Sequence, residues 1–374
     1  MKTMLFHPFE LAFSGWSGSG KTTLATAIIR ILSERFRVGY YKHGCHRFDI
    51  DRKGKDSELA TSAGAHTVMI SDPEKTALIA DPKQKALERQ AFLDCDILLV
   101  EGLKELPLPK IVMVDTEQKI LDLVAEGSLA NIIAFAFPEP PRSSPIPGIP
   151  AFNRNDASEI ADFIVAHLLQ RAAEEVPLSA IVAAGGKSSR MGTDKALLRY
   201  HDSNQLVHTA ELLKPFCSEV FISCREDQAG LYGNFGIPLL TDSYLGIGPL
   251  GGLLSAQKKN PDSAWIMLAC DLPFLDDQTV RQLAEGRNPF RFATALCSSR
   301  SGRPEPLAAC YEPKSRPRLL LRHAEGINSP ASFLETSRIS ELHTGIAETL
   351  LNINTPEERD RYKAPHGRTK DQQQ

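Results

Sequence analysis

The first part of the chain contains the segment Leu11-Ala-Phe-Ser-Gly-Trp-Ser-Gly-Ser-Gly-Lys-Thr22. Residues Gly15 to Thr22 fit the pattern G-x-x-x-x-G-K-[ST], after a short apolar run and before a helix-like one. Glycines let backbone N–H groups turn inward around phosphate oxygens, and the N-terminus of a helix adds partial positive charge. The segment therefore predicts a strand, a phosphate-binding loop and a helix, in that order.

The side chains of this loop predict a nucleotide site with Mg²⁺. Lys21 is expected to reach the β- and γ-phosphates, and the Thr22 hydroxyl is expected to bind the metal. A carboxylate should lie at the end of a neighbouring buried strand, and Glu101, directly after Ile97–Val100, fits this role. The expected nucleotide-binding residues are Gly15, Ser17, Gly18, Ser19, Gly20, Lys21, Thr22, Thr23 and Glu101.

A loop after the second predicted strand is rich in potential ligands. It contains His43, His46, Asp49 and Asp51. These side chains could hold a metal, contact the nucleotide or receive a partner, but their spacing matches no zinc template. A solvated loop is an equally good interpretation, and both interpretations stay open.

The N-terminal half resembles the MobB family, the adaptors of molybdopterin-guanine dinucleotide biosynthesis, over about residues 9–173. The resemblance rests on the phosphate loop, Lys42-His43, Gly54-Lys-Asp-Ser57 and Val100-Glu-Gly102. It implies that the bound nucleotide is GTP, that its hydrolysis is weak, and that this half supports a guanylyltransferase.

A second, different glycine-rich loop begins the C-terminal half. The segment Ala183-Ala-Gly-Gly-Lys-Ser-Ser-Arg-Met-Gly-Thr-Asp-Lys195 follows an apolar run directly. Its glycines let backbone amides wrap a triphosphate, while Arg190 and Lys195 bring positive charge. This combination suits displacement at the α-phosphorus, where charge builds on the transferred group and on the departing pyrophosphate.

Two aspartates at predicted strand ends complete the second site. Asp271 follows Trp265-Ile-Met-Leu-Ala-Cys270, and Asp242 follows Ile237-Pro-Leu-Leu-Thr241. Ligands of α/β sheets bind at the carboxyl ends of the strands, and hard cations prefer carboxylate oxygens. We therefore expect Asp271 to hold Mg²⁺ and Asp242 to make a second contact.

The C-terminal half resembles the MobA family of molybdenum cofactor guanylyltransferases over residues 178–360. The matching segments are the second loop, Thr241-Asp-Ser243, Pro249–Leu253, Cys270–Pro273 and Asn352–Glu358. Carried over, the resemblance implies a GTP site made of Ala183, Ala184, Gly185, Gly186, Lys195, Ser223, Asp242 and Asp271, with Arg190, Lys195 and Asp271 catalytic. The family usually has Leu at the position of Ala183 and commonly Asn at that of Ser223. Asn354 and the segment Arg303-Pro-Glu-Pro306 look like the pterin side of the cleft.

Together the two resemblances imply transfer of GMP from GTP to the phosphate of molybdenum-carrying molybdopterin, with release of pyrophosphate. Mg²⁺ is the implied cofactor. The implied partners are GTP, the molybdopterin cofactor, and molybdoenzymes with their chaperones. Two alternatives stay open. The same fold serves cytidylyltransferases and sugar-1-phosphate nucleotidyltransferases, and the chain could also be a non-catalytic, GTP-regulated cofactor carrier.

Short apolar runs alternate with helix-like segments in both halves, which predicts an α/β fold. We expect an N-terminal P-loop NTPase-like domain with a mostly parallel sheet and a C-terminal domain with a Rossmann-like nucleotidyltransferase sheet. The predicted domains are residues 1–173 and 178–362, with a short linker at 174–177 and a disordered tail at 363–374.

Composition argues against several classes of protein. The formal net charge is −3 over 374 residues, with both signs mixed along the chain, so binding to nucleic acid or anionic membrane is not expected. No apolar run of the sequence reaches the ~20 residues that a membrane helix needs. The seven cysteines include no Cys-x-x-Cys pair, which indicates reduced thiols rather than a disulfide framework. We expect a soluble, cytoplasmic protein.

Overall fold

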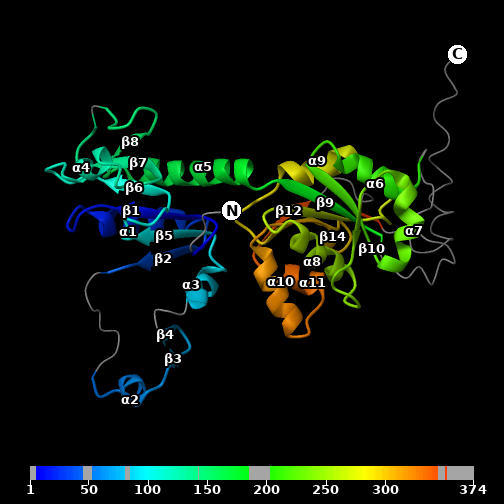
Figure 1. The fold of residues 1–374 in the computed structure, drawn as a ribbon, viewed down its shortest axis with the longest axis horizontal. Helices are drawn as coiled ribbons and strands as arrows, with labels where there is room; N and C mark the ends of the chain where they lie inside the picture. Colours follow the sequence, from blue (N-terminus) through cyan, green and yellow to red (C-terminus); the bar gives the residue numbers. More distant parts are fainter. Residues whose placement is uncertain are drawn as a thin grey trace. The chain divides into compact units, whose positions relative to one another are not determined.

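The computed structural model of the protein describes residues 6–44, 53–80, 85–141, 143–184, 203–343 and 350–351. The chain divides into two compact units, residues 1–168 and 169–374, each built around its own sheet (Figure 1). The division falls within helix α5 (Ala157–Glu175). The domain boundaries and linker that the sequence suggested stay predictions.

The N-terminal unit contains a parallel sheet of six strands. Their order is β2-β5-β1-β6-β7-β8, and every neighbouring pair is parallel. The central strands β1, β5 and β6 are buried along their whole length, as expected for a sheet covered on both faces. The strands are β1 (Glu10–Ser14), β2 (Val38–Lys42), β5 (Ile97–Glu101), β6 (Lys110–Met113), β7 (Ile132–Phe137) and β8 (Ala151–Asn153).

Helix α1 (Lys21–Leu32) follows β1 through the phosphate loop, as predicted. It buries Leu24, Ala25, Ile28 and Leu32, whose spacing gives one apolar face that packs against β1 and β5. An antiparallel hairpin of β3 (Thr67–Ser71) and β4 (Thr76–Ala80) was not expected. This unit also contains α2 (Asp56–Ser62), α3 (Lys85–Phe92), α4 (Ile120–Ala125) and the first part of α5.

The C-terminal unit contains a mixed sheet of seven strands in the order β11-β10-β9-β12-β14-β13-β15. The strands from β11 to β12 are parallel, which is the arrangement expected from the sequence. Strand β14 runs antiparallel to both neighbours, and β15 pairs in parallel with β13 at the edge. The strands are β9 (Leu178–Ala183), β10 (Glu219–Cys224), β11 (Leu239–Thr241), β12 (Ala264–Ala269), β13 (Ala293–Cys297), β14 (Pro304–Tyr311) and β15 (Ile339–His343).

Helices cover both faces of this second sheet. Figure 1 shows α8, α10 and α11 on one side and α6 and α9 on the other. Helix α8 is buried through most of its length, because it packs against β9, β11 and β12. The α-helices are α6 (Gln205–Leu213), α7 (Ala229–Tyr232), α8 (Pro249–Lys259), α9 (Asp277–Glu285), α10 (Ser315–Ala324) and α11 (Pro330–Thr336), and short 3₁₀ helices span Glu226–Gln228 and Gly233–Phe235. Within the described ranges, no helix combines the length and the apolar character needed to span a bilayer.

Candidate functional sites

The loop between β1 and α1 forms a cradle for phosphate. Gly18 and Gly20 have φ angles of 78° and 86°, in the left-handed region that favours glycine. Gly15 allows a close approach to β6, because a Cβ there would lie 2.7 Å from the Ser19 Oγ and 2.9 Å from the Met113 Cβ. The loop then enters α1, whose first N–H groups have no acceptor within the helix and are available to an anion.

Lys21 bends back over this loop. Its Nζ donates hydrogen bonds to the carbonyl oxygens of Gly15 at 3.2 Å and Trp16 at 2.7 Å. Burial lowers the pKa of Lys21; Lys104 and Lys42 lower it further and Glu101 opposes them. The ammonium group therefore lies inside the loop, where the sequence predicts that it meets the β- and γ-phosphates.

Glu101, at the end of β5, is the centre of a polar network. Its carboxylate accepts hydrogen bonds from the Thr22 Oγ1 at 2.9 and 3.0 Å and from the Tyr40 hydroxyl at 2.5 Å, and the Lys42 Nζ lies 3.1 Å away. The side chain is almost fully buried, with 6% of the residue exposed. Burial alone would raise the pKa of Glu101, but bonds from Tyr40, Thr22 and Lys42 outweigh it and hold the pKa below its ordinary value. Glu101 is thus a carboxylate at neutral pH.

These groups fit a Mg²⁺ ion. The Thr22 hydroxyl and the Glu101 carboxylate are hard oxygen donors, already in contact with each other, beside the phosphate cradle. The Lys42 ammonium lies 3.1 Å from Glu101 and 3.4 Å from the Thr22 Oγ1, so a cation already contacts both oxygen donors, and a bound Mg²⁺ would take its place. The structure therefore brings Thr22, the predicted metal ligand of this loop, into contact with Glu101, its predicted acidic partner.

Two residues beside the first loop, Arg154 and Lys104, were not predicted from the sequence. Arg154, just past β8, donates from Nη1 to the Ser19 carbonyl oxygen at 3.1 Å. The Lys104 Nζ lies 3.9 Å from the centre of the Trp16 ring. Lys104 comes soon after the end of β5 and Arg154 directly after the end of β8. Their positions after the carboxyl ends of parallel strands could have identified them as neighbours of the phosphate loop. Ser17, Thr22 and Thr23 are exposed and Ser19 is buried.

The histidine-rich loop after β2 is described only in part. The His43 N–H donates to the Glu101 carbonyl oxygen at 3.0 Å, which extends the pairing of β2 with β5. His46, Asp49 and Asp51 lie outside the described residues.

In the C-terminal sheet, three strands end at one edge in register. Ala183 of β9 pairs with Ser223 of β10 on one side and with Ala269 of β12 on the other. The Ala184 N–H donates to the Ser223 carbonyl oxygen at 2.9 Å. The Ala184 carbonyl oxygen accepts from the Tyr232 hydroxyl at 3.4 Å, so both backbone groups of Ala184 have partners and its small side chain leaves room for a nucleotide. Asp271 follows β12 at the same edge.

Ser223 and Asp242 form a pair beside helix α8. The Ser223 Oγ donates to the Asp242 Oδ1 at 3.3 Å, and the Asp242 N–H donates to the Cys224 carbonyl oxygen at 3.0 Å. Burial raises the pKa of Asp242 above its ordinary value, although the Ser223 hydrogen bond and the charge of Arg225 act against this. The predicted contacts among the described residues therefore all lie within two residues of the carboxyl end of a strand at one edge of the sheet; they are Ala183, Ala184, Ser223, Asp242 and Asp271.

Glu305 joins Asp271 at this edge. Burial raises the pKa of Glu305, its neighbour Asp271 raises it further, and a hydrogen bond from the Leu307 N–H partly offsets both. Two carboxylates that lie close enough for the charge of one to raise the pKa of the other are suitable oxygen donors for Mg²⁺. The sequence assigned Glu305 only to the segment Arg303–Pro306, and its place beside Asp271 was not predicted. Strand β14 enters the sheet antiparallel, so its first residues, not its last, lie beside Asp271.

Other predicted residues of the second site lie outside the described part of the chain. They are Gly185, Gly186, Arg190, Lys195 and Asn354. Arg303 is described: it is exposed in the turn between β13 and β14, where its carbonyl oxygen accepts from the Ser298 N–H at 2.9 Å. Its assignment to the pterin side stays a prediction.

Two family models match the chain in succession. Residues 10–137 match the model described as molybdopterin guanine dinucleotide synthesis protein B, and residues 180–341 match the MobA-like NTP transferase domain. These ranges contain, respectively, the phosphate loop with Glu101 and the edge with Ala183, Asp242 and Asp271.

Individual relatives each match less than half of this chain. A molybdenum cofactor biosynthesis bifunctional protein of Synechocystis is 30% identical over 49% of this chain and 53% of its own length. A probable molybdenum cofactor guanylyltransferase of Carboxydothermus hydrogenoformans is 32% identical over 48% of this chain and 91% of its own length. A molybdopterin-guanine dinucleotide biosynthesis adapter protein of Escherichia coli is 32% identical over 41% of this chain and 90% of its own length.

Proposed function

Since the chain belongs to the MobB family through its N-terminal half and to the MobA-like NTP transferases through its C-terminal half, we propose that it makes the guanine dinucleotide form of the molybdenum cofactor. The C-terminal half is a nucleotidyltransferase domain. In the proposed reaction it transfers GMP from GTP to the terminal phosphate of molybdopterin carrying molybdenum, and pyrophosphate leaves.

One observation carries the assignment of chemistry to the C-terminal half. Ala184, the Ser223–Asp242 pair and the carboxylates of Asp271 and Glu305 lie together where the strands of one sheet end. This is the edge at which α/β proteins bind their ligands. In the sequence, the glycine-rich segment follows Ala184 directly.

In the proposed transfer, an oxygen of the pterin phosphate attacks the α-phosphorus of GTP in line with the departing pyrophosphate. A new P–O bond forms as the bond to the β-phosphate oxygen breaks, so no protein nucleophile is required. Asp271 and Glu305 would hold Mg²⁺, which neutralises triphosphate charge when bound. Arg190 and Lys195 are assigned to the charge that develops on the transferred group and the pyrophosphate.

The N-terminal half is proposed as a GTP-binding adapter with weak hydrolytic activity. Lys21 and the first turn of α1 bind the phosphates, and Thr22 with Glu101 would hold Mg²⁺. The network of Tyr40 and Lys42 around Glu101 supports this role, because it fixes the carboxylate beside the loop. Delivery of cofactor to molybdoenzymes and their chaperones is the corresponding proposal for partners.

The test is a transfer assay with the purified full-length chain. GTP, Mg²⁺ and molybdopterin are mixed, and pyrophosphate release and the dinucleotide product are followed, with CTP and ATP in parallel reactions. The proposal expects product with GTP and release of one pyrophosphate per dinucleotide. Equal turnover of CTP would contradict the choice of guanine, and the absence of product with every nucleotide would support a carrier without catalysis.

A further inference from the structure

Cys297, Glu341 and His343 form a cluster of three different metal-binding side chains in the C-terminal unit. Their ligand atoms all lie within 4.8 Å of one another. Cys297 is buried, with 1% of the residue exposed, whereas Glu341 and His343 are exposed. None of the three takes part in the proposed guanylyl transfer.

The pairing of two strands explains how these residues meet. Cys297, the last residue of β13, lies in register with His343, the last residue of β15, and Ala295 lies in register with Glu341. Because side chains two residues apart share a face of a strand, Glu341, His343 and Cys297 point to the same side of the sheet. The register of β13 with β14 shifts between Ala295 and Cys297, at the point where the cysteine enters the cluster.

We propose that Cys297, Glu341 and His343 bind a divalent cation of the Zn²⁺ type, with water in the remaining position. A thiolate, an imidazole nitrogen and a carboxylate oxygen are the common zinc ligands, and three protein ligands with one open position is a frequent arrangement. The donor set disfavours Mg²⁺, which takes oxygen ligands. The site therefore differs in chemistry from both proposed Mg²⁺ sites.

Metal binding at this place requires a proton to leave. The Cys297 thiol hydrogen bonds to Glu341, and burial raises the pKa of the thiol to about 11, with Glu341 raising it further. Without a metal, the Cys297 thiol therefore keeps its proton. A cation bound to the sulfur favours the thiolate instead, since a coordinating thiol is deprotonated. The thiol proton passes to solvent, and the bond between Cys297 and Glu341 is replaced by bonds from both groups to the metal.

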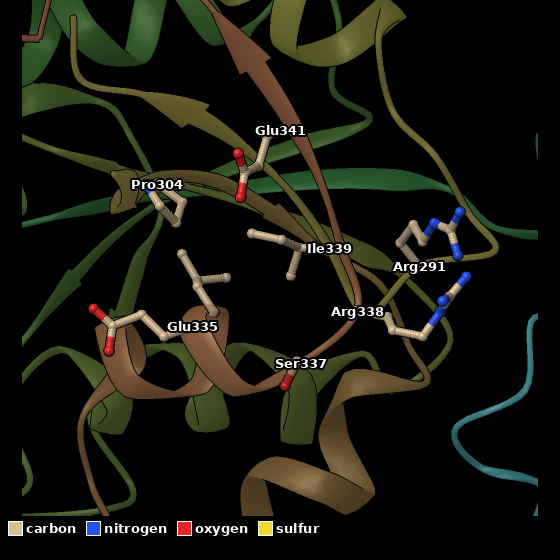
Figure 2. Close-up of a pocket in the computed structure, with 8 residues that line it drawn as sticks. Arg291, Pro304, Glu335, Ser337, Arg338, Ile339 and Glu341 are labelled. Carbon is tan, nitrogen blue, oxygen red and sulfur yellow. The ribbon is translucent and has the colours of Figure 1, made fainter. Parts of the chain in front are cut away.

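The location suggests what the cation does. Strand β15 is the edge strand of the seven-stranded sheet, and among its described neighbours it pairs only with β13. A metal held by both strands links the edge strand to the sheet. A pocket of about 410 Å³ opens beside the cluster, and Figure 2 shows Glu341 and Pro304 on one side of it and Arg291 and Arg338 on another. Glu341 thus belongs to both the cluster and the wall of the pocket.

The test uses the full-length chain after treatment with a chelator. Zn²⁺ is titrated against a chromophoric competitor, Co²⁺ is added as a spectroscopic probe, and thermal unfolding is recorded with and without Zn²⁺. We expect one Zn²⁺ per chain at this site, a thiolate-to-cobalt charge-transfer band, and a higher Tm with Zn²⁺ because the metal binds only the folded cluster.

Three substitutions locate the site, and one matched control checks them. His343→Ala and Cys297→Ser should each weaken binding by more than the roughly 10–100-fold that loss of an outer-shell partner costs. Glu341→Gln should weaken it too, whereas Glu335→Gln, an exposed carboxylate that lines the same pocket, should leave it unchanged. Cys297 is buried, so Cys297→Ser could disturb folding. His343 is exposed, and His343→Ala should fold normally and still test the site. Unchanged affinity in His343→Ala, or Co²⁺ binding without the charge-transfer band, would overturn the proposal.

Discussion

Gly252 lies directly against Ser223: a Cβ at this glycine would stand 2.3 Å from the serine Oγ and 3.6 Å from the Asp242 Oδ1. The same Oγ donates a hydrogen bond to Asp242. Helix α8 therefore approaches the proposed GTP site through a residue without a side chain. Because Gly252 leaves no room for a Cβ, the position of α8 limits the orientations that Ser223 and Asp242 can take.

Gly252→Ala should impair guanylyl transfer by pushing Ser223 and Asp242 away from their present positions. Displacements of about 1 Å near a reacting group can cost on the order of 100-fold in rate. We expect the KM for GTP to rise and kcat/KM to fall by 10- to 100-fold, on the order set by that displacement. Gly230→Ala in α7 is the control, because a Cβ there meets no atom within 4 Å. Equal kinetics for the two variants would show that the close contact does not matter.

Gly102→Ala should destabilise the N-terminal unit. Gly102 has a φ of 104°, and a Cβ there would lie 2.8 Å from the His43 carbonyl oxygen. Strained backbone of this kind costs roughly 1–3 kcal/mol. Gly64 has a similar φ of 101° but open space around its Cβ position, so Gly64→Ala measures backbone strain alone. Urea unfolding of both variants should give the larger loss for Gly102→Ala, and the reverse order would exclude the clash with His43.

Tyr40→Phe removes one of the hydrogen bonds that lower the pKa of Glu101. A carboxyl group whose folded-state pKa is lowered stabilises the fold above its ordinary pKa and loses this contribution as the pH falls. The variant should therefore be less stable than the natural protein by about 1 kcal/mol at pH 7, with the difference shrinking below about pH 4.5. Chemical unfolding across this pH range measures it. A difference that stays constant with pH would mean that the hydroxyl does not act through Glu101.

Asp242→Asn should show the opposite dependence on pH. Burial raises the pKa of Asp242, so the charged form of this group lowers the stability of the folded state at neutral pH. An asparagine keeps the shape and can still accept from Ser223, so we expect the variant to be more stable than the natural protein at pH 7. The gain should disappear as the pH falls through the raised pKa towards the ordinary value of about 3.9. Lower stability at pH 7 would show that the charge is compensated by Arg225.

The sequence predicted most reliably those elements whose structure depends on residues close together in the chain. The phosphate loop and the buried strands β1, β5 and β12 follow from glycine spacing and apolar runs, and the structure confirms these elements. The hairpin of β3 and β4 was missed because most of its side chains are exposed. Neither strand has a buried face, so its sequence does not alternate between apolar and polar residues. The position of Glu305 beside Asp271 was missed for another reason. Strand direction depends on contacts far apart in the sequence, so the antiparallel β14 could not be predicted from its own residues.

A pair of substitutions separates the roles of the two halves. Asp271→Asn keeps the size of the side chain but removes the charge that a hard cation requires. If Asp271 holds the catalytic Mg²⁺, guanylyl transfer should fall by about 10³-fold or more, which corresponds to several kcal/mol of barrier. GTP hydrolysis by the N-terminal half should stay unchanged in this variant.

Lys21→Ala should have the complementary effect. The Lys21 ammonium lies inside the phosphate loop on the carbonyl oxygens of Gly15 and Trp16, so its loss should weaken GTP binding and abolish hydrolysis in the N-terminal half. Guanylyl transfer should remain nearly normal when molybdopterin is abundant and fall only when it is limiting, because an adapter improves delivery and not the chemical step. Both variants are first checked for folding by circular dichroism and then measured in both assays. Loss of transfer in Lys21→Ala together with normal transfer in Asp271→Asn would place the chemistry in the other half, because the residue that limits the reaction must then lie in the phosphate loop.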